Sequence, residues 1–150
     1  MLIILSFHLI NRCGKRKTCM HNYGIIYLKM KEFDRLVEVV ATLRKKCPWD
    51  RAQTHKTLKP YMIEEVNEAI EAIDHGNHKH LAEELGDMLL HIVMHAEMGK
   101  EEGHFTIEKI IQGITKKMIR RHPHVFGKGK AKTIKGVLRR WKQIKSEEKK

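Results

Sequence analysis

The sequence predicts an all-α fold: a four-helix bundle followed by a basic C-terminal helix. Apolar residues recur at three- and four-residue steps through most of residues 31–150, which is the repeat of an amphipathic helix. Proline, glycine and threonine stand at the positions where such runs begin or end. No stretch of residues 31–150 alternates apolar and polar side chains beside hairpin residues, so we expect no sheet.

The first predicted helix runs from Glu32 to about Lys46, because Pro48 excludes the residue before it from helical geometry. Residues 47–55 form the loop that follows. The second helix begins between residues 57 and 60, where a proline is tolerated in the first turn, and it stops at Gly76. These connections are as short as those of a helical bundle.

The third predicted helix extends from about His78 to Glu102, and Gly103 supplies its C-terminal stop. Thr106 is the expected N-cap of the fourth helix, which ends before Pro123. The basic tail after residues 127–129 has apolar residues at helical spacing, so we expect a last helix there.

The distribution of charged residues divides the chain into regions of opposite charge. The 150 residues include 30 Lys and Arg against 18 Asp and Glu, a formal net charge of +12. Residues 106–150 hold 15 basic and 3 acidic residues, whereas residues 63–102 hold 11 acidic and 2 basic ones. This acidic centre argues against a chain that only binds nucleic acid. We expect an N-terminal extension, disordered or outside the native domain (1–29), a helical bundle (30–127) and a basic C-terminal tail (128–150).

The cysteines and the N-terminus indicate the compartment. Three cysteines, an odd number without a CxxC pair, are typical of a reducing compartment, and we expect the cytoplasm. The apolar start of the chain covers about ten residues, which is too short to span a bilayer. It has no basic residue before it and no small-residue cleavage site, so we expect no membrane partner.

Four carboxylates form the candidate functional site. Glu65 and Glu68 border the apolar stripe of the second helix, and Glu84 and Asp87 border that of the third. The short turn at Gly76 allows the two helices to run antiparallel and bring the four side chains together. The stripes expected to face the core are Met62, Val66, Ala69, Ile70 and Ile73, and Leu81, Leu85, Leu89, Ile92 and Ala96. Grouped carboxylates repel unless a cation lies among them, and oxygen ligands suit Mg²⁺ or Mn²⁺ rather than Zn²⁺.

Five motifs in order give the sequence a familiar pattern. They are Cys47-Pro48-Trp49-Asp50, Gln53-Thr54-His55, Glu64-Glu65-x-x-Glu68, Glu83-Glu84-Leu85-Gly86-Asp87 and Arg120-Arg121-His122-Pro123-His124-Val125-Phe126-Gly127. Over roughly residues 31–147 the sequence closely resembles the MazG nucleoside triphosphate pyrophosphohydrolases. The resemblance implies the all-α NTP pyrophosphatase bundle, a homodimer or higher homo-oligomer, and hydrolysis of an NTP or dNTP between the α- and β-phosphates. The products would be the monophosphate and pyrophosphate.

The resemblance also implies roles for individual residues. It makes Glu65, Glu68, Glu84 and Asp87 the catalytic ligands of Mg²⁺, with Mn²⁺ as a substitute. Lys117 and Arg121 are similar to a basic pair that binds the phosphates, and Trp141 aligns with a tryptophan near the nucleotide. Trp49 is a further ring on which a base could stack. The sequence departs from the family in two respects: it has one copy of a pattern that many members carry twice, and Tyr61 and His80 replace lysines found in some copies.

Two other functions compete with this interpretation. The basic tail and Arg120-Arg121 could bind nucleic acid, although no aromatic residues are interleaved with the charges. His91 and His95 have the spacing of metal ligands and could belong to a zinc or di-iron bundle, although no helix offers the ExxH pair of a di-iron site. We favour the hydrolase, without assigning its general base, because Glu64 lies on the far face of its helix.

The third predicted helix carries a sign of oligomerisation. Leu90 and Met94 lie opposite its main apolar stripe, so the helix is apolar nearly all round. A four-helix monomer covers such a helix poorly. We therefore expect a dimer.

Overall fold

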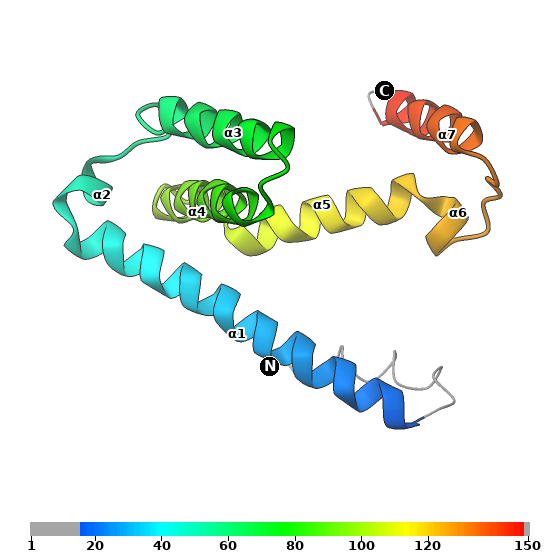
Figure 1. Ribbon diagram of the computed structural model, residues 1–150, viewed down its shortest axis with the longest axis horizontal. Helices are drawn as coiled ribbons and strands as arrows, with labels where there is room; N and C mark the ends of the chain where they lie inside the picture. Colours follow the sequence, from blue (N-terminus) through cyan, green and yellow to red (C-terminus); the bar gives the residue numbers. More distant parts are fainter. Residues whose placement is uncertain (1–15, 149–150) are drawn as a thin grey trace. The chain divides into compact units, whose positions relative to one another are not determined.

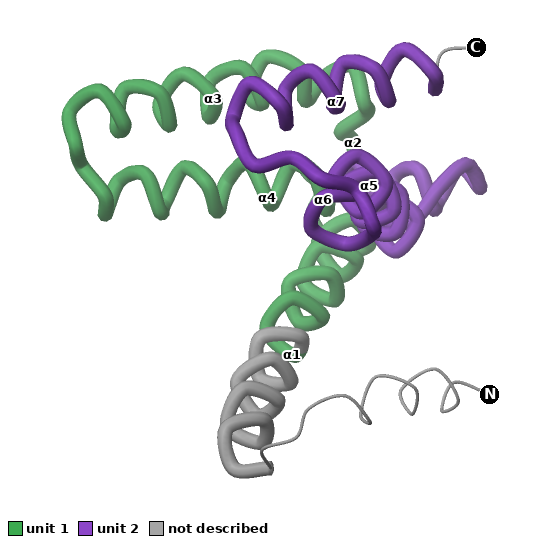
Figure 2. The backbone as a smooth tube through the Cα atoms, turned by 90° about the vertical axis from the view of Figure 1, so that its right-hand side faces the viewer, with its two compact units in different colours: residues 1–93 green, residues 94–150 purple. Residues whose placement is uncertain are grey.

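The computed structural model describes the backbone of residues 16–148 and the side chains of residues 31–148. This part of the chain contains helices, turns and loops and no strand, which confirms the predicted all-α class. The chain forms two compact units, one ending at Val93 and the other beginning at Met94 (Figure 2). Within the described residues, no helix is both long and apolar enough to cross a membrane. The domain boundaries predicted near residues 30 and 128 stay a prediction.

The first unit contains α1 (Arg16–Lys46), α2 (Pro48–Ala52), α3 (Lys59–Asp74) and the part of α4 (His78–Glu101) that ends at Val93 (Figure 1). The prediction that the first helix starts at Glu32 was wrong, because α1 extends back to Arg16, where the described backbone begins. No proline interrupts residues 16–31, and the single Gly24 costs a helix only about 1 kcal/mol. Nothing in the sequence therefore forces a break before Glu32.

A short helix, α2, occupies part of the predicted loop after α1. Pro48 lies in its first turn, where the missing N–H costs nothing. The guanidinium of Arg44, in the last turn of α1, donates from Nη1 to the carbonyl oxygens of Asp50 and of Gln53, the latter at 2.9 Å. A single side chain of α1 therefore binds the middle and the C-terminal end of α2, the short helix that carries Trp49.

The turn between α3 and α4 makes these helices antiparallel neighbours (Figures 1 and 2). Gly76 adopts a φ of 64°, which glycine reaches without steric cost, and its N–H donates to the carbonyl oxygen of Ile73 at 3.0 Å. The side chain of Asn77 then accepts from the N–H of His80 at 3.2 Å and caps α4. The predicted stop at Gly76 is confirmed.

The apolar stripes of α3 and α4 are largely exposed, so the prediction that they face a core within the chain was wrong. In α3 only Ala69 of the stripe is buried, and Ile73 is 59% exposed. In α4 Ala96 is buried, but Leu85 is 52% exposed. Two antiparallel helices cover only one side of each other, and here the acidic edges are the sides that meet. The stripes therefore need cover that the described part of one chain does not supply.

The second unit contains the end of α4, then α5 (Ile107–Arg121), α6 (Pro123–Phe126) and α7 (Ile134–Glu147). Gly103, with a φ of 74°, turns the chain so that the ring of Phe105 packs on Gly99, where a Cβ atom would lie 2.6 Å from the ring. Thr106 caps α5 by accepting from the N–H of Lys109, as predicted. α7 is the predicted last helix, and Ile144 is its buried residue.

Candidate active site

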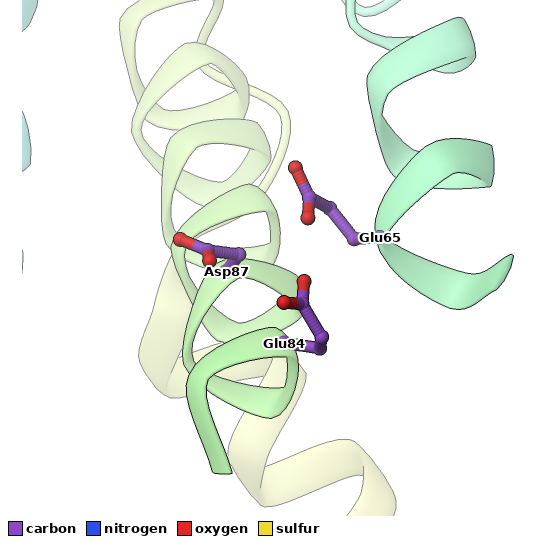
Figure 3. Close-up of side chains that lie close together, drawn as sticks. All are labelled: Glu65, Glu84 and Asp87. Atoms are coloured by element: carbon purple, nitrogen blue, oxygen red, sulfur yellow. The ribbon is translucent and has the colours of Figure 1, made fainter. Parts of the chain in front are cut away.

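Three carboxylates meet between α3 and α4 of the first unit. One oxygen each of Glu65, Glu84 and Asp87 lies within 4.8 Å of the others, with Glu65 on α3 and the other two on α4 (Figure 3). Glu84 is buried, Glu65 is partly buried, and Asp87 is exposed. The helical repeat and the Gly76 turn thus bring together three of the four carboxylates predicted from the sequence.

Glu68, the fourth predicted carboxylate, lies beside Glu84 and outside this group of three. Its side chain shares a hydrogen bond with that of Glu84. Partial burial raises the pKa of Glu68, and the negative charge of Glu84 raises it further. The raised pKa of Glu68 thus reflects its burial first and the neighbouring carboxylate of Glu84 second.

Two histidines contact the carboxylates. His80 Nε2 lies 2.8 Å from Glu84 Oε1, one turn away on the same helix. This pair was not predicted, since His80 stood out only as a departure from the family, although its i,i+4 spacing to Glu84 is that of interacting side chains on a helix. His91 is buried, with Nε2 3.7 Å from Glu65 Oε1.

The donor set decides which cation fits. Among the residues that the structure describes, Glu65, Glu84 and Asp87 are the group of three able to hold a metal ion, and neither His91 nor His95 belongs to it. All the donors in the group are carboxylate oxygens, which suit a hard cation such as Mg²⁺ or Mn²⁺ better than zinc. The residues present therefore fit the metal that the family resemblance implied.

The predicted phosphate-binding residues lie in the second unit. Lys117 and Arg121 are one turn apart on α5, where Lys117 is exposed and the Arg121 side chain is 14% exposed. The Arg121 guanidinium carbon lies 5.2 Å from the ring centroid of Trp141 on α7, a cation–π contact. The His122 ring meets Trp141 edge-on at 5.0 Å. The structure thus brings Arg121 and Trp141 together, as neighbours on two helices.

Glu148, the residue after α7 that pairs with these arginines, was not predicted from the sequence. Its carboxylate binds Arg121 Nη2 at 2.5 Å and Arg120 Nη2 at 2.6 Å. The Arg121 hydrogen bond lowers the pKa of Glu148 to about 2, and the same contact raises the pKa of Arg121. No periodicity links residues 27 positions apart, so no sequence signal identified this pair.

Trp49, the other predicted stacking residue, belongs to the first unit. It lies in α2, is 50% exposed, and meets the ring of Tyr61 edge-on with the centroids 5.8 Å apart. Arg44 holds the short helix that carries it. An exposed aromatic ring on a fixed turn can stack on a planar ligand.

Comparison with known proteins identifies the family. Residues 53–126 match the model of the MazG nucleotide pyrophosphohydrolase domain. The chain belongs to the MazG family. The crystal structure of a MazG-related protein from Thermotoga maritima aligns with 75% of the present chain and 98% of its own, with a TM-score of 0.65 and 28% identity. The resemblance drawn from the five motifs is therefore confirmed.

Curated relatives extend the match beyond the family domain. The nucleoside triphosphate pyrophosphohydrolase/pyrophosphatase MazG of Thermotoga maritima is 50% identical over 119 residues, which cover 78% of this chain and 45% of that protein. A nucleoside triphosphate pyrophosphohydrolase of Escherichia coli is 43% identical over 122 residues, 79% of this chain and 46% of its own length. YabN of Bacillus subtilis, an uncharacterized protein, is 49% identical over 144 residues, which cover 89% of this chain and 29% of that protein. The MazG-family chain thus spans less than half the length of these relatives.

Proposed function

We propose that this chain hydrolyses nucleoside triphosphates, as ribo- or deoxyribonucleotides, between the α- and β-phosphates to release the monophosphate and pyrophosphate. The observation that carries the proposal is the cluster of Glu65, Glu84 and Asp87, with Glu68 beside it, in a family of nucleotide pyrophosphohydrolases. Two relatives that are named nucleoside triphosphate pyrophosphohydrolases share 43% and 50% identity with the chain.

The proposed cofactor is Mg²⁺, with Mn²⁺ as a substitute, and Glu65, Glu68, Glu84 and Asp87 would hold it. When bound, such a cation supplies positive charge to the phosphate oxygens and acidifies a coordinated water. The protein's own contribution begins with orientation. His80, with Nε2 2.8 Å from Glu84 Oε1, would help to hold the Glu84 carboxylate in place.

The basic and aromatic residues would bind the nucleotide. Lys117 and Arg121 offer charged donors to phosphate oxygens, and a guanidinium matches the spacing of two such oxygens. Trp141 and Trp49 offer ring faces for the base. Cationic donors stabilise the negative charge that develops on the departing pyrophosphate, so loss of Lys117 or Arg121 should lower kcat/KM.

We propose that the chain works as a homodimer or higher homo-oligomer in the cytoplasm. The exposed apolar stripes of α3 and α4, for which Ile73 and Leu85 are examples, support the assembly because such contiguous patches mark interfaces. The odd number of cysteines supports a reducing compartment. Analytical ultracentrifugation tests the assembly: a stable monomer at micromolar concentration would contradict it, as would an Ile73→Glu variant with unchanged sedimentation.

A product assay tests the proposed reaction. A panel of ribo- and deoxyribonucleoside triphosphates is incubated with the protein and Mg²⁺, and pyrophosphate and orthophosphate are measured separately. We expect pyrophosphate as the primary product, and orthophosphate in its place would refute α–β cleavage.

A matched pair of variants assigns that activity to the carboxylate cluster. Glu84→Gln should abolish turnover and leave the helical circular dichroism intact. Glu83→Gln is the control, because it removes an exposed carboxylate from the same helix, one residue away. Retained turnover in Glu84→Gln would remove the cluster from the mechanism.

A further inference from the structure

The carboxylate of Glu148 joins two neighbouring guanidiniums of the second unit. It accepts from Arg121 Nε at 3.2 Å and Nη2 at 2.5 Å, and from Arg120 Nε at 2.7 Å. The Glu148 side chain is 20% exposed, so water screens these contacts only partly. One carboxylate therefore fixes two cations that would otherwise repel each other.

The contact uses one edge of Arg121 and leaves another open. A guanidinium has a side edge formed by Nε and Nη2 and an end edge formed by Nη1 and Nη2, and either edge can bind a pair of oxygens. Glu148 occupies the side edge. Within the described part of the chain, Nη1 of Arg121 makes no hydrogen bond, so the end edge remains available to a second anion.

The ring of Trp141 lies against the same guanidinium. The Arg121 guanidinium carbon lies over the Trp141 ring, 5.2 Å from its centroid, and the His122 ring meets Trp141 edge-on. The His122 ring is itself held, because its Nδ1 donates to the carbonyl oxygen of Met118 at 2.6 Å. Glu148 thus holds the side edge of Arg121, and Trp141 packs against the same guanidinium.

Glu148 stays ionised wherever the enzyme could work. The Arg121 hydrogen bond holds the pKa of Glu148 at about 2, far below neutral pH. The pair is therefore a permanent structural contact at physiological pH. Position 148 follows the last residue of α7, so this contact also ties the end of that helix to the end of α5.

We propose that Glu148 is a positioning residue for nucleotide binding, which holds the side edge of Arg121 so that its end edge faces the substrate phosphates. This inference rests on the proposed function, because it assumes that Arg121 binds the triphosphate. Glu148 does not touch the substrate. It lowers the cost of binding, since an arginine held in its bound orientation loses little rotamer freedom.

Steady-state kinetics of pyrophosphate release test the proposal. We expect Glu148→Gln to raise KM for the nucleotide about tenfold and to change kcat less than about twofold. Glu147→Gln is the matched control: it removes a neighbouring carboxylate whose contact, at 3.0 Å, is with Gln143, and it should leave KM unchanged. An unchanged or lowered KM in Glu148→Gln would overturn the proposal.

A double-mutant cycle separates positioning from a purely structural role. If Glu148 acts through Arg121, Glu148→Gln adds nothing to the KM of an Arg121→Gln variant. Full additivity would mean that Glu148 acts elsewhere, and would refute the inference. Glu148→Asp retains the charge and should restore most of the affinity. If Glu148→Gln loses helical circular dichroism and cannot be assayed, Glu148→Asp takes its place in the KM comparison.

A binding measurement distinguishes failure of the inference from failure of the proposed function. Inorganic triphosphate is the probe, and the signal is Trp141 fluorescence in a Trp49→Phe background, where it is the single tryptophan. Triphosphate binding that Glu148→Gln weakens, in a protein without turnover, would refute the proposed function and support the inference. If Glu148→Gln changes neither turnover nor triphosphate binding, the inference about Glu148 is refuted and the proposed function stands.

Discussion

Asp87→Asn should stabilise the metal-free protein and remove its response to metal. The substitution keeps the side-chain shape and deletes one of three charges whose oxygens lie within 4.8 Å of one another. Two unit charges at this distance repel by about 3.5 kcal/mol at an effective dielectric constant of 20, and by about 0.9 kcal/mol in water. Because Asp87 is exposed, the lower figure applies. Asp87 repels both Glu65 and Glu84, so we expect the free energy of unfolding to rise by about 1–2 kcal/mol in EDTA.

Saturating Mg²⁺ should reverse the order. A ligand at one hundred times its Kd stabilises a folded protein by about 2.7 kcal/mol, and only the protein with all the carboxylates gains this fully. Urea denaturation with EDTA or Mg²⁺ measures both differences. Glu83→Gln is the control and should differ from wild type by less than about 0.5 kcal/mol in EDTA. The reasoning is refuted if Asp87→Asn is less stable than wild type in EDTA, or if Mg²⁺ stabilises the two proteins equally.

Two further predictions concern the second unit. Gly99→Ala should destabilise the protein by about 1–2 kcal/mol, because the new Cβ atom would lie 2.6 Å from the Phe105 ring. Gly113→Ala is the control: the new Cβ atom has open space there and should stabilise α5 by about 0.5–1 kcal/mol. Urea denaturation compares the two variants, and equal free energies of unfolding would contradict the packing of Phe105 on Gly99. Below pH 4.5 the Glu148 contact should weaken. A carboxyl whose folded pKa is lowered to about 2 contributes stability that is complete above its ordinary value of 4.5 and lost as pH falls through 2. Trp141 fluorescence in the Trp49→Phe background should change across this range, and a Glu148→Gln variant that shows the same transition would contradict the assignment.

Most helix ends could be predicted because single residues determine them. Gly76 and Gly103 adopt positive φ, a proline stands just beyond α5, and Thr106 satisfies a free N–H. Each of these effects acts within one turn of the chain. A prediction from local sequence therefore succeeds where the cause is local.

The start of α1 and the short helices α2 and α6 could not be predicted in the same way. α1 already covers Arg16, the first residue that the structure describes, and residues 16–31 contain no proline that would mark a boundary before Glu32. α2 depends on Arg44, which reaches forward from the preceding helix to two backbone carbonyls. Such contacts depend on tertiary geometry, which periodicity does not encode.

In the candidate site, too, the features with a local cause were predictable and those with a long-range cause were not. Glu65, Glu84 and Asp87 could be predicted to meet because a helical repeat and one tight turn place them, and both features are local. The exposure of the apolar stripes was missed because a wheel shows which face is apolar and not what covers it. Glu148 was missed because its partners are 27 and 28 residues away.

The position of Glu148 places a contact of α5 just outside the helix that precedes it. The last helical residue of α7 is Glu147, so Glu148 belongs to none of the helices in the part of the chain that the structure describes. Its carboxylate is nevertheless the counterion shared by Arg120 and Arg121, and a cut between residues 147 and 148 would leave two adjacent cations unpaired. Such a cut would change how the protein binds anions while these helices stay intact. Intact mass should therefore be checked in any preparation used to measure nucleotide affinity.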